Sequence, residues 1–157
     1  MYHTIVKQKL RSSFAQVNAG NLDAIVAQFT PDAEHWFSGD HALSGRRQGS
    51  AQIQQWYDRL GRVLPDLRFE ITGISVSGLP NDTVAMVEWI DHFTDPAGAA
   101  YTNQGVHVVR LAWGKIRSLH IFCDTQVITA ALGHLAEQGR EEAAAEPIGT
   151  PTAFATV

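Results

Sequence analysis

The sequence predicts an α+β domain, a cone-shaped α+β barrel in which a strongly curved antiparallel sheet wraps around N-terminal helices. Apolar residues recur at helical spacing through most of the first 64 residues and at strand spacing through residues 67–124. A further helical pattern closes the domain over residues 125–138. Because amphipathic helices and a half-buried sheet must cover each other's apolar sides, the curved sheet encloses a conical space, which is a natural ligand site.

Length, composition and charge exclude several classes of protein. A chain of 157 residues, 45% hydrophobic and 18% charged, suffices for one globular domain with a core. The net charge of −4 and the dispersed basic residues predict no nucleic-acid partner and no membrane partner. The N-terminus lacks a signal-peptide core, and no apolar run approaches the roughly 18 residues of a membrane span, so we expect a cytoplasmic protein. Cys123 is the one cysteine, which we interpret as a buried, unreactive thiol.

Three helices are expected before the main sheet, over residues 4–18, 21–29 and 50–60. Gly20 can take the left-handed conformation that ends the first helix. Asn21 and Ser50 are favoured N-caps of the second and third, and Pro31 stops the second. The expected inward stripes are Val6, Leu10, Phe14 and Val17, then Leu22, Ile25, Val26 and Phe29, then Ile53, Trp56, Tyr57 and Leu60.

A short strand is expected at residues 33–38, followed later by a meander of four strands. The four segments are residues 67–77, 84–93, 101–112 and 115–124. Gly73 breaks the alternation of the first segment and predicts a bulge. The segment 39–49 contains three glycines and is expected to be a loop at the mouth of the cavity. Residues 140–157 lack a core-building period, so we expect a single domain over residues 1–139 and, after it, a loosely ordered tail or an arm on a partner subunit.

The hairpin of residues 101–124 carries most of the side chains with useful chemistry. Its first strand places Asn103 and His107 on one face, because alternate residues of a strand share a face. Its second strand places a matching set on one face: His120, Phe122 and Asp124. If both faces belong to the concave surface, a histidine, an acid and an amide open into one cavity.

Three segments also carry a family resemblance: FAQVNAGNLDAIVAQFTPDAEHWF, SGRRQGSAQIQQWYDRL and RLAWGKIRSLHIFCDTQ. Over roughly residues 6–135 the chain resembles the SnoaL-like branch of the nuclear-transport-factor-2-like superfamily. Members of that superfamily include polyketide cyclases, ketosteroid isomerases, limonene epoxide hydrolases, scytalone dehydratases and non-catalytic binding modules. The resemblance is specific for the fold and much less so for the activity.

The resemblance implies roles for two residues of the hairpin. Asp124 stands where SnoaL-type cyclases and epoxide hydrolases place an acid/base aspartate. His107 stands near the oxyanion-donating aspartic acid of ketosteroid isomerases. The chain departs from both enzyme families at other positions. Phe37 replaces the isomerase base, Ser13 stands near its tyrosine, and Trp89 with Asp91 replaces an arginine-x-aspartate pair, so a standard member of either family is not expected.

We expect Asp124 to move a proton and His107 to donate to a developing oxyanion or to relay the proton. Each has a structural alternative, since Asp124 is also a favoured cap for the last helix and His107 lies among valines. The expected ligand-contacting residues are His35, Trp36, Tyr57, Trp89, Asp91, Asn103, His120 and Phe122. His107, His120 and Asp124 could also form a two-histidine, one-carboxylate metal site, but we expect neither a metal nor a cofactor.

Two hypotheses for function follow. The first is a small cofactor-independent enzyme that cyclises, isomerises, dehydrates or opens an epoxide in a hydrophobic, oxygen-bearing small molecule. The second is a non-catalytic module of the same fold that binds a small molecule or dimerises. The resemblance implies a homodimer formed through the open sheet face, with a polar part supplied by Arg68, Glu70, Arg110 and Arg117.

Overall fold

The computed structural model describes residues 1–152 of the 157-residue chain. The helices are α1 (Tyr2–Asn18), α2 (Leu22–Val26), α3 (Ser50–Val63), α4 (Thr125–Glu137) and the short 3-10 helix η1 (Glu141–Ala144). The strands are β1 (Phe29–Phe37), β2 (Gly45–Gln48), β3 (Arg68–Leu79), β4 (Asp82–Thr94), β5 (Ala100–Ala112) and β6 (Lys115–Cys123). Within residues 1–152 no helix has both the length and the apolar character needed to cross a membrane.

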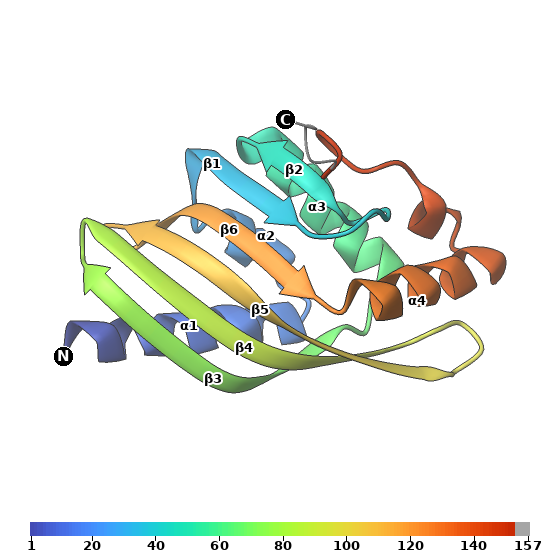
Figure 1. The fold of residues 1–157 in the computed structure, drawn as a ribbon, viewed down its shortest axis with the longest axis horizontal. Coiled ribbons are helices and arrows are strands. Elements are labelled where there is room, and N and C mark those ends of the chain that lie inside the picture. The colour runs from blue at the N-terminus through green and yellow to red at the C-terminus, as the bar shows by residue number, and fades with distance from the viewer. Residues whose placement is uncertain (153–157) are drawn as a thin grey trace.

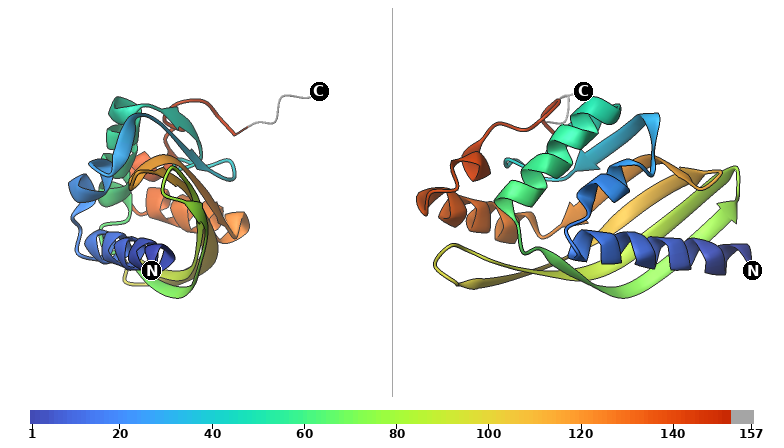
Figure 2. Two further views of the ribbon diagram at one scale, coloured as in Figure 1. Left: turned by 90° about the vertical axis from the view of Figure 1, so that its left-hand side faces the viewer. Right: turned by 180° about the vertical axis from the view of Figure 1, so that it is seen from behind.

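The strands form one curved sheet in the order β2-β1-β6-β5-β4-β3. Figure 1 shows this sheet in front of the first three helices, with α4 at the end of β6. In the end-on view of Figure 2 the long strands curl around α1, so that the helices fill the concave side. The fold class predicted from the sequence, an α+β cone with a strongly curved sheet, is confirmed.

The apolar stripes meet inside this cone. Helix α1 buries Val6, Leu10 and Phe14, as its spacing predicted. Helix α3 buries Ile53, Trp56, Tyr57, Leu60 and Val63. On β4, burial alternates with the strand period, so Val87, Trp89, Asp91 and Phe93 all face inward. These side chains form one continuous core with the inner residues of β5 and β6.

Two irregularities interrupt the long strands. The pairing of β3 with β4 shifts between Ile71 and Gly73, which confirms the bulge predicted at that glycine. The pairing of β5 with β6 shifts in the same way, where Arg110 lies opposite Ser118 but Leu111 lies opposite Ile116. A bulge inserts one unpaired residue, so the inward-facing positions of β6 change parity at this point.

The sheet is mixed, whereas the sequence predicted an antiparallel one. Strand β1 pairs in parallel with β6 and antiparallel with β2, a strand that lies in the segment expected to be a loop. Helix α2 ends at Val26 and β1 begins at Phe29, earlier than expected. Pro31 lies within β1 where the pairing with β6 is interrupted between Phe29 and Glu34, so its missing N–H breaks no ladder.

The segment after α4 packs on the domain. Ala143 of η1 is buried, and Thr150 exchanges backbone hydrogen bonds of 2.7 and 2.9 Å with Arg46 on β2. Figure 1 shows this segment returning from α4 to the β2 edge. The expectation of a loosely ordered tail is therefore wrong for residues 140–152, because their backbone groups pair with an open sheet edge. The rest of that predicted tail, residues 153–157, lies outside the described residues.

Candidate functional site

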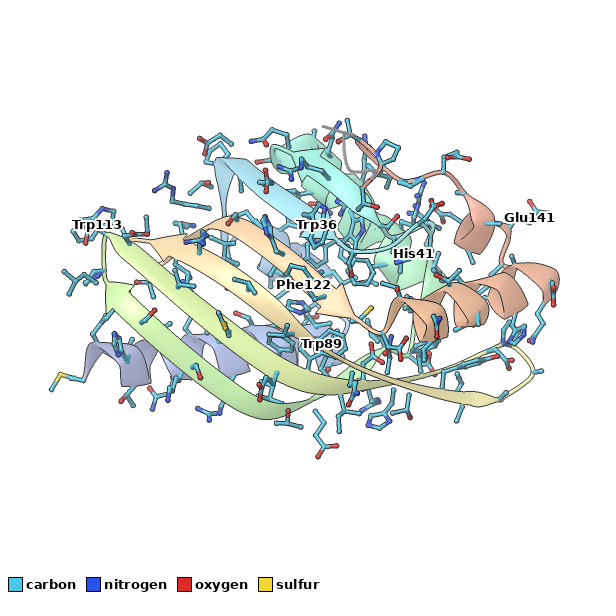
Figure 3. The ribbon with its side chains drawn as sticks, in the orientation of Figure 1. Trp36, His41, Trp89, Trp113, Phe122 and Glu141 are labelled. Carbon is cyan, nitrogen blue, oxygen red and sulfur yellow. The ribbon has the colours of Figure 1, made fainter. Side chains whose placement is uncertain are left out.

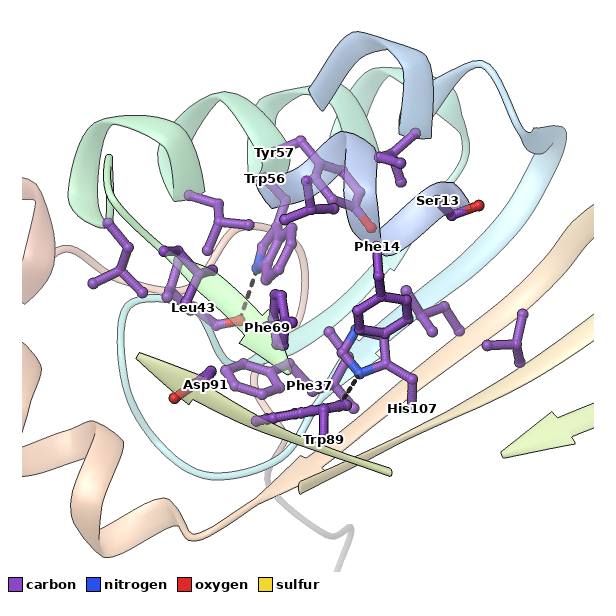
Figure 4. A pocket seen from close by; sticks show the side chains of 18 of the residues that line it. Ser13, Phe14, Phe37, Leu43, Trp56, Tyr57, Phe69, Trp89, Asp91 and His107 are labelled. Carbon is purple, nitrogen blue, oxygen red and sulfur yellow. Dashed lines mark hydrogen bonds between the residues drawn. The ribbon is translucent and has the colours of Figure 1, made fainter. Parts of the chain in front are cut away.

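A cavity of about 80 Å³ lies between α1, α3 and the concave face of the sheet (Figure 4). One water molecule needs roughly 10–15 Å³ of such space, so the cavity admits something larger than a few waters. Its wall is mainly aliphatic and aromatic. The helices contribute residues such as Leu10, Phe14, Val17, Trp56 and Leu60, and the strands contribute Phe37, Phe69, Trp89, Val109 and Ile121. Within residues 1–152 no lysine or arginine lines it.

Polar atoms enter this wall at few places. Ser13, Tyr57, Asp91 and His107 line the cavity alongside the apolar side chains. The Ser13 hydroxyl is used within the protein, since it lies 2.8 Å from Gln28 Oε1 and 3.0 Å from the Lys9 carbonyl oxygen. Burial raises the pKa of the Tyr57 phenol well above its usual value, so Tyr57 stays protonated. Tyr57 therefore keeps an O–H that can donate a hydrogen bond, and Asp91 and His107 are the other two groups with acid/base or donor chemistry.

His107 is held as a neutral imidazole. Its Nδ1 accepts a hydrogen bond of 2.7 Å from the Trp89 indole N–H, drawn in Figure 4. Its ring packs against Phe14 and Phe69, with centroids 5.1 and 5.9 Å away. Burial lowers the pKa of His107 to about 3, because a charged imidazolium would have to leave water. The ring proton is therefore on Nε2, and His107 can donate a hydrogen bond but is a poor proton acceptor.

Asp91 is the titratable acid of the cavity. Its side chain is buried, and this burial raises the pKa of the carboxyl to about 6. The hydrogen bond that it accepts from the Asn103 backbone N–H, 3.1 Å long, and the nearby His92 oppose the rise. Near neutral pH the carboxyl can therefore both release and take up a proton.

Asp91 and His107 lie at different ends of the cavity. In the pairing of β4 with β5, Asp91 stands opposite Asn103, and His107 stands opposite Val87. Four residues of strand separate the two positions, which is roughly 13 Å at the usual rise per residue. Trp89 lies between them on the same face (Figure 4). A ligand could contact both groups, but the two do not form a hydrogen-bonded pair.

The predicted pairing of His107 with Asp124 is not present. Asp124 is the N-cap of α4, where its Oδ1 accepts from the backbone N–H groups of Gln126 and Val127 at 3.1 and 3.3 Å. It is exposed and does not line the cavity. Asp124 therefore has the structural role that the sequence offered as an alternative, the N-cap of the last helix. It follows β6 and precedes α4, whose first backbone N–H groups need an acceptor.

Trp36, His120 and Phe122 also lie away from the cavity, on the outer face of the sheet (Figure 3 labels Trp36 and Phe122). His120 and Phe122 stand opposite Val108 and Val106, whereas the inward residues of β6 are Leu119 and Ile121. The Trp36 ring lies 4.9 Å from that of Phe122, and His120 Nε2 lies 2.6 Å from Glu34 Oε1. The expected face of β6 was one residue out of phase, which corrects His120 and Phe122 to the outer face. Trp36 also lies on the outer face, because His35 and Phe37 take the buried positions of β1.

His35 and Asn103 are buried without lining the cavity. His35 Nδ1 accepts a hydrogen bond of 3.1 Å from Arg47 Nε, and its ring packs 4.2 Å from Trp56. Asn103 donates from Nδ2 to the Asp124 carbonyl oxygen at 3.0 Å, which ties β5 to the start of α4. Of the expected ligand-contacting residues, the structure therefore brings Tyr57, Trp89 and Asp91 to the cavity.

The sequence did not assign a site role to the two rings that enclose His107, Phe14 and Phe69. Phe14 belonged to a predicted helical stripe and Phe69 to the strand predicted over residues 67–77, so the one available signal was their place in apolar patterns. The metal alternative is also not assembled, since His107 and His120 lie on opposite faces of the sheet. Among residues 1–152 no three His, Cys, Asp or Glu side chains lie close enough to hold a metal ion.

Comparisons with known proteins agree with this architecture. Residues 10–119 match the family model of the SnoaL-like domain, and no curated protein sequence matches the chain. An NTF2-like protein of unknown function from Burkholderia pseudomallei superposes with a TM-score of 0.67 at 20% identity, over 76% of this chain and 91% of that one. TerC, co-crystallised with polyporic acid, superposes with a TM-score of 0.63 at 21% identity, over 83% of this chain and 96% of that one.

A Mycobacterium tuberculosis protein of unknown function covers more of the chain, with a TM-score of 0.67 at 16% identity over 97% of this chain and 96% of that one. At these identities the similarity to solved structures shows the fold alone. The family model adds membership, because it spans most of the sequence. This chain belongs to the SnoaL-like domain family.

Proposed function

We propose that this chain is a small cofactor-independent enzyme that carries out acid/base chemistry on an uncharged, hydrophobic, oxygen-bearing molecule. Asp91 moves the proton, and His107 donates a hydrogen bond from Nε2 to an oxygen that gains negative charge. Cyclisation, isomerisation, dehydration and epoxide opening all combine these two events. Asp91 thus takes the role that the sequence had suggested for Asp124.

One observation carries this proposal: two titratable groups of a single apolar cavity have pKa values shifted in opposite directions. The pKa of Asp91 is raised to about 6, which suits a group that exchanges a proton near neutral pH. The pKa of His107 is lowered to about 3, which suits a neutral hydrogen-bond donor. Both shifts have one cause, burial, which favours the uncharged form of each group and leaves Asp91 as the one of the two that titrates near neutral pH.

The size and charge of the cavity support a small neutral substrate. A void of about 80 Å³ is small, so it suits a compact molecule better than a four-ring one. An anionic substrate would find no lysine or arginine among the lining residues of the described chain. A structural neighbour, TerC, was co-crystallised with a small organic molecule, polyporic acid, which is consistent with ligand binding by this fold.

The test compares Asp91→Asn with Asp124→Asn on a panel of bicyclic enolisable ketones and epoxides. We expect Asp91→Asn to lower kcat by about 100-fold or more, because the proton-transfer group is lost. Asp124→Asn is the matched control, since asparagine also caps helices well and the side chain lies outside the cavity. Unchanged turnover in Asp91→Asn would remove the proposed mechanism.

The second candidate function is a non-catalytic small-molecule-binding module. It is favoured by the hydrogen bond between Asp91 and the Asn103 backbone, which gives the carboxyl a structural task on β5. Under this reading Asp91→Asn lowers stability, while the wild-type chain binds the ketones without converting any of them. Binding measured by calorimetry beside turnover measured on the same panel separates the two functions.

We also propose that two copies associate through the outer face of the sheet. This face exposes Phe122 and Met86, at 42% and 48%, and Trp36 packs beside Phe122. Sedimentation of the wild-type chain should give the mass of a dimer, and Phe122→Glu should give a monomer, since a charge would be buried at the interface. A monomeric wild-type chain would contradict this. Cytoplasmic location remains a prediction from the sequence.

A further inference from the structure

The Trp89 indole is packed over a glycine of the neighbouring strand. Trp89 on β4 stands directly opposite Gly105 on β5. A Cβ atom at Gly105 would first meet the Phe122 backbone carbonyl oxygen of β6, and it would lie 2.7 Å from both Cη2 and Cζ2 of the indole, closer than real side chains approach one another. Phe69 packs edge-on against the indole, with a centroid distance of 5.0 Å and an interplanar angle of 82°. The indole therefore occupies space that exists because residue 105 has no side chain.

From this position the indole N–H reaches His107, which lies two residues further along β5 on the same face. The donor–acceptor distance between Trp89 Nε1 and His107 Nδ1 is 2.7 Å. An indole nitrogen can only donate a hydrogen bond, so His107 Nδ1 must be the unprotonated nitrogen of the ring. The opposite tautomer would place two N–H groups against each other inside a nonpolar wall.

We propose that Trp89, packed over Gly105, is a positioning residue that holds His107 in its Nε2-protonated tautomer and so offers a fixed N–H to the ligand. This inference rests on the proposed function, in which His107 donates to a ligand oxygen. Without the indole, the imidazole could turn its lone pair toward the cavity, and that lone pair would repel the same oxygen. Trp89 acts through His107 and takes no part in proton transfer.

A second buried tryptophan supplies a contrast within the same wall. Trp56 is as buried as Trp89, but its Nε1–H donates 2.8 Å to the backbone carbonyl of Leu43. Replacing either indole by a phenyl ring removes one hydrogen bond and some packed volume. The replacement at position 89 alone removes the partner of His107, so Trp56→Phe is the matched control for effects of lost packing.

The test reads the tautomer of His107 by NMR on the ¹⁵N-labelled full chain. In the wild-type chain we expect Nε2 to carry the proton, Nδ1 to show the shift of an acceptor, and a scalar coupling across the bond from Trp89 Nε1 to His107 Nδ1. In Trp89→Phe both nitrogen shifts should move toward the average of two tautomers. Trp56→Phe should leave the shifts in place. Absence of the coupling in the wild-type chain overturns the inference even if no variant folds.

A binding measurement adds the consequence for the ligand. The probes are 1-tetralone and tetralin, a bicyclic ketone and the hydrocarbon that lacks its oxygen. The wild-type chain should prefer the ketone, and Trp89→Phe should reduce that preference about fivefold, the value of one ordinary hydrogen bond. An unreduced preference overturns the inference. Failure of the proposed function is a different result: Asp91→Asn would keep full turnover, while the nitrogen shifts of His107 would still behave as expected.

Discussion

The Asp91 carboxylate accepts a hydrogen bond of 3.1 Å from the backbone N–H of Asn103, the residue directly opposite it on β5. This bond favours the charged carboxylate, whereas burial disfavours it, and burial is the larger effect because the pKa is raised to about 6. A carboxyl balanced in this way changes its charge close to neutral pH. It does so at the edge of an apolar cavity, where a change of charge has large consequences for a bound molecule.

The first prediction concerns the pH dependence of catalysis. If Asp91 is the general base, it works as the carboxylate, so kcat/KM should rise with pH through a midpoint near 6 and then level off. His107 should add no limb above about pH 4, because its pKa is lowered to about 3 and the ring stays neutral. A pH–rate profile from pH 4.5 to 9 measures this. A profile without a limb between pH 5 and 7 would contradict the assignment of Asp91.

The second prediction concerns the pH dependence of stability. Burial lowers the pKa of His41 to about 4 and of His107 to about 3, and that of His35 well below its usual value of 6.5. Between these values and 6.5 the unfolded chain binds protons that the folded chain does not, so the free energy of unfolding should fall as the pH drops. Asp91 acts in the opposite direction, because its raised pKa means that the folded chain takes up a proton first.

Urea unfolding at pH 7, 6, 5 and 4 measures this balance. Asp91→Asn should make the loss of stability in acid steeper, since it removes the carboxyl whose raised pKa opposes the effect of the histidines. His107→Gln should make the loss shallower, since glutamine takes up no proton in the unfolded chain. A wild-type chain that gains stability from pH 6 to pH 4 would show that these histidines are not neutral in the fold.

The third prediction compares two neighbouring arginines. Arg47 is fully buried and donates to the carbonyl oxygens of Ser44, Gly45 and Ile148, and its Cζ lies 5.5 Å from the centroid of the Trp56 ring. Arg47→Ala should lower the free energy of unfolding by about 3 kcal/mol or more, because several buried acceptors lose their donor. Arg46→Ala is the control, since it removes one exposed ion pair with Glu34 and should cost at most about 1 kcal/mol. Equal losses in denaturant unfolding would contradict the structural role of Arg47.

The fourth prediction concerns the segment that returns to the sheet edge. Gly149 has a φ of +90°, and a Cβ there would lie 2.0 Å from the Arg46 carbonyl oxygen. Gly139 has a similar φ of +97°, with no atom within 4 Å of the added carbon. Both alanine substitutions strain the backbone by about 1 kcal/mol or more, but only Gly149→Ala should also displace the segment.

Hydrogen exchange of the Arg46 amide is the local measurement, because that N–H donates to the Thr150 carbonyl oxygen at 2.7 Å. The amide should exchange faster in Gly149→Ala and at the wild-type rate in Gly139→Ala. Similar exchange rates in both variants would show that the close approach of Gly149 to β2 does not hold the segment in place.

Much of the architecture follows from patterns within single segments. The helical stripe of Val6, Leu10 and Phe14 and the break at Gly73 were both visible in the sequence, because each depends on neighbouring residues along the chain. Features that depend on distant segments were not visible in this way. The parallel pairing of β1 with β6 joins segments about 85 residues apart, as in the pair of Trp36 with His120, and no local pattern encodes it.

Local patterns were enough to predict the α+β class and to name His107 and Asp91 as candidate cavity residues. They left open whether the face of β5 that carries His107 is the concave one. The tertiary structure decided which acid shares the cavity with His107. Apolar residues occupy both faces of β6, so alternation could not choose between Ile121 and Phe122, and the bulge opposite Leu111 shifted the phase by one residue. Asp124 thus became a helix cap at the end of the strand, while Asp91, positioned by an uninterrupted pairing with β5, remained in the cavity.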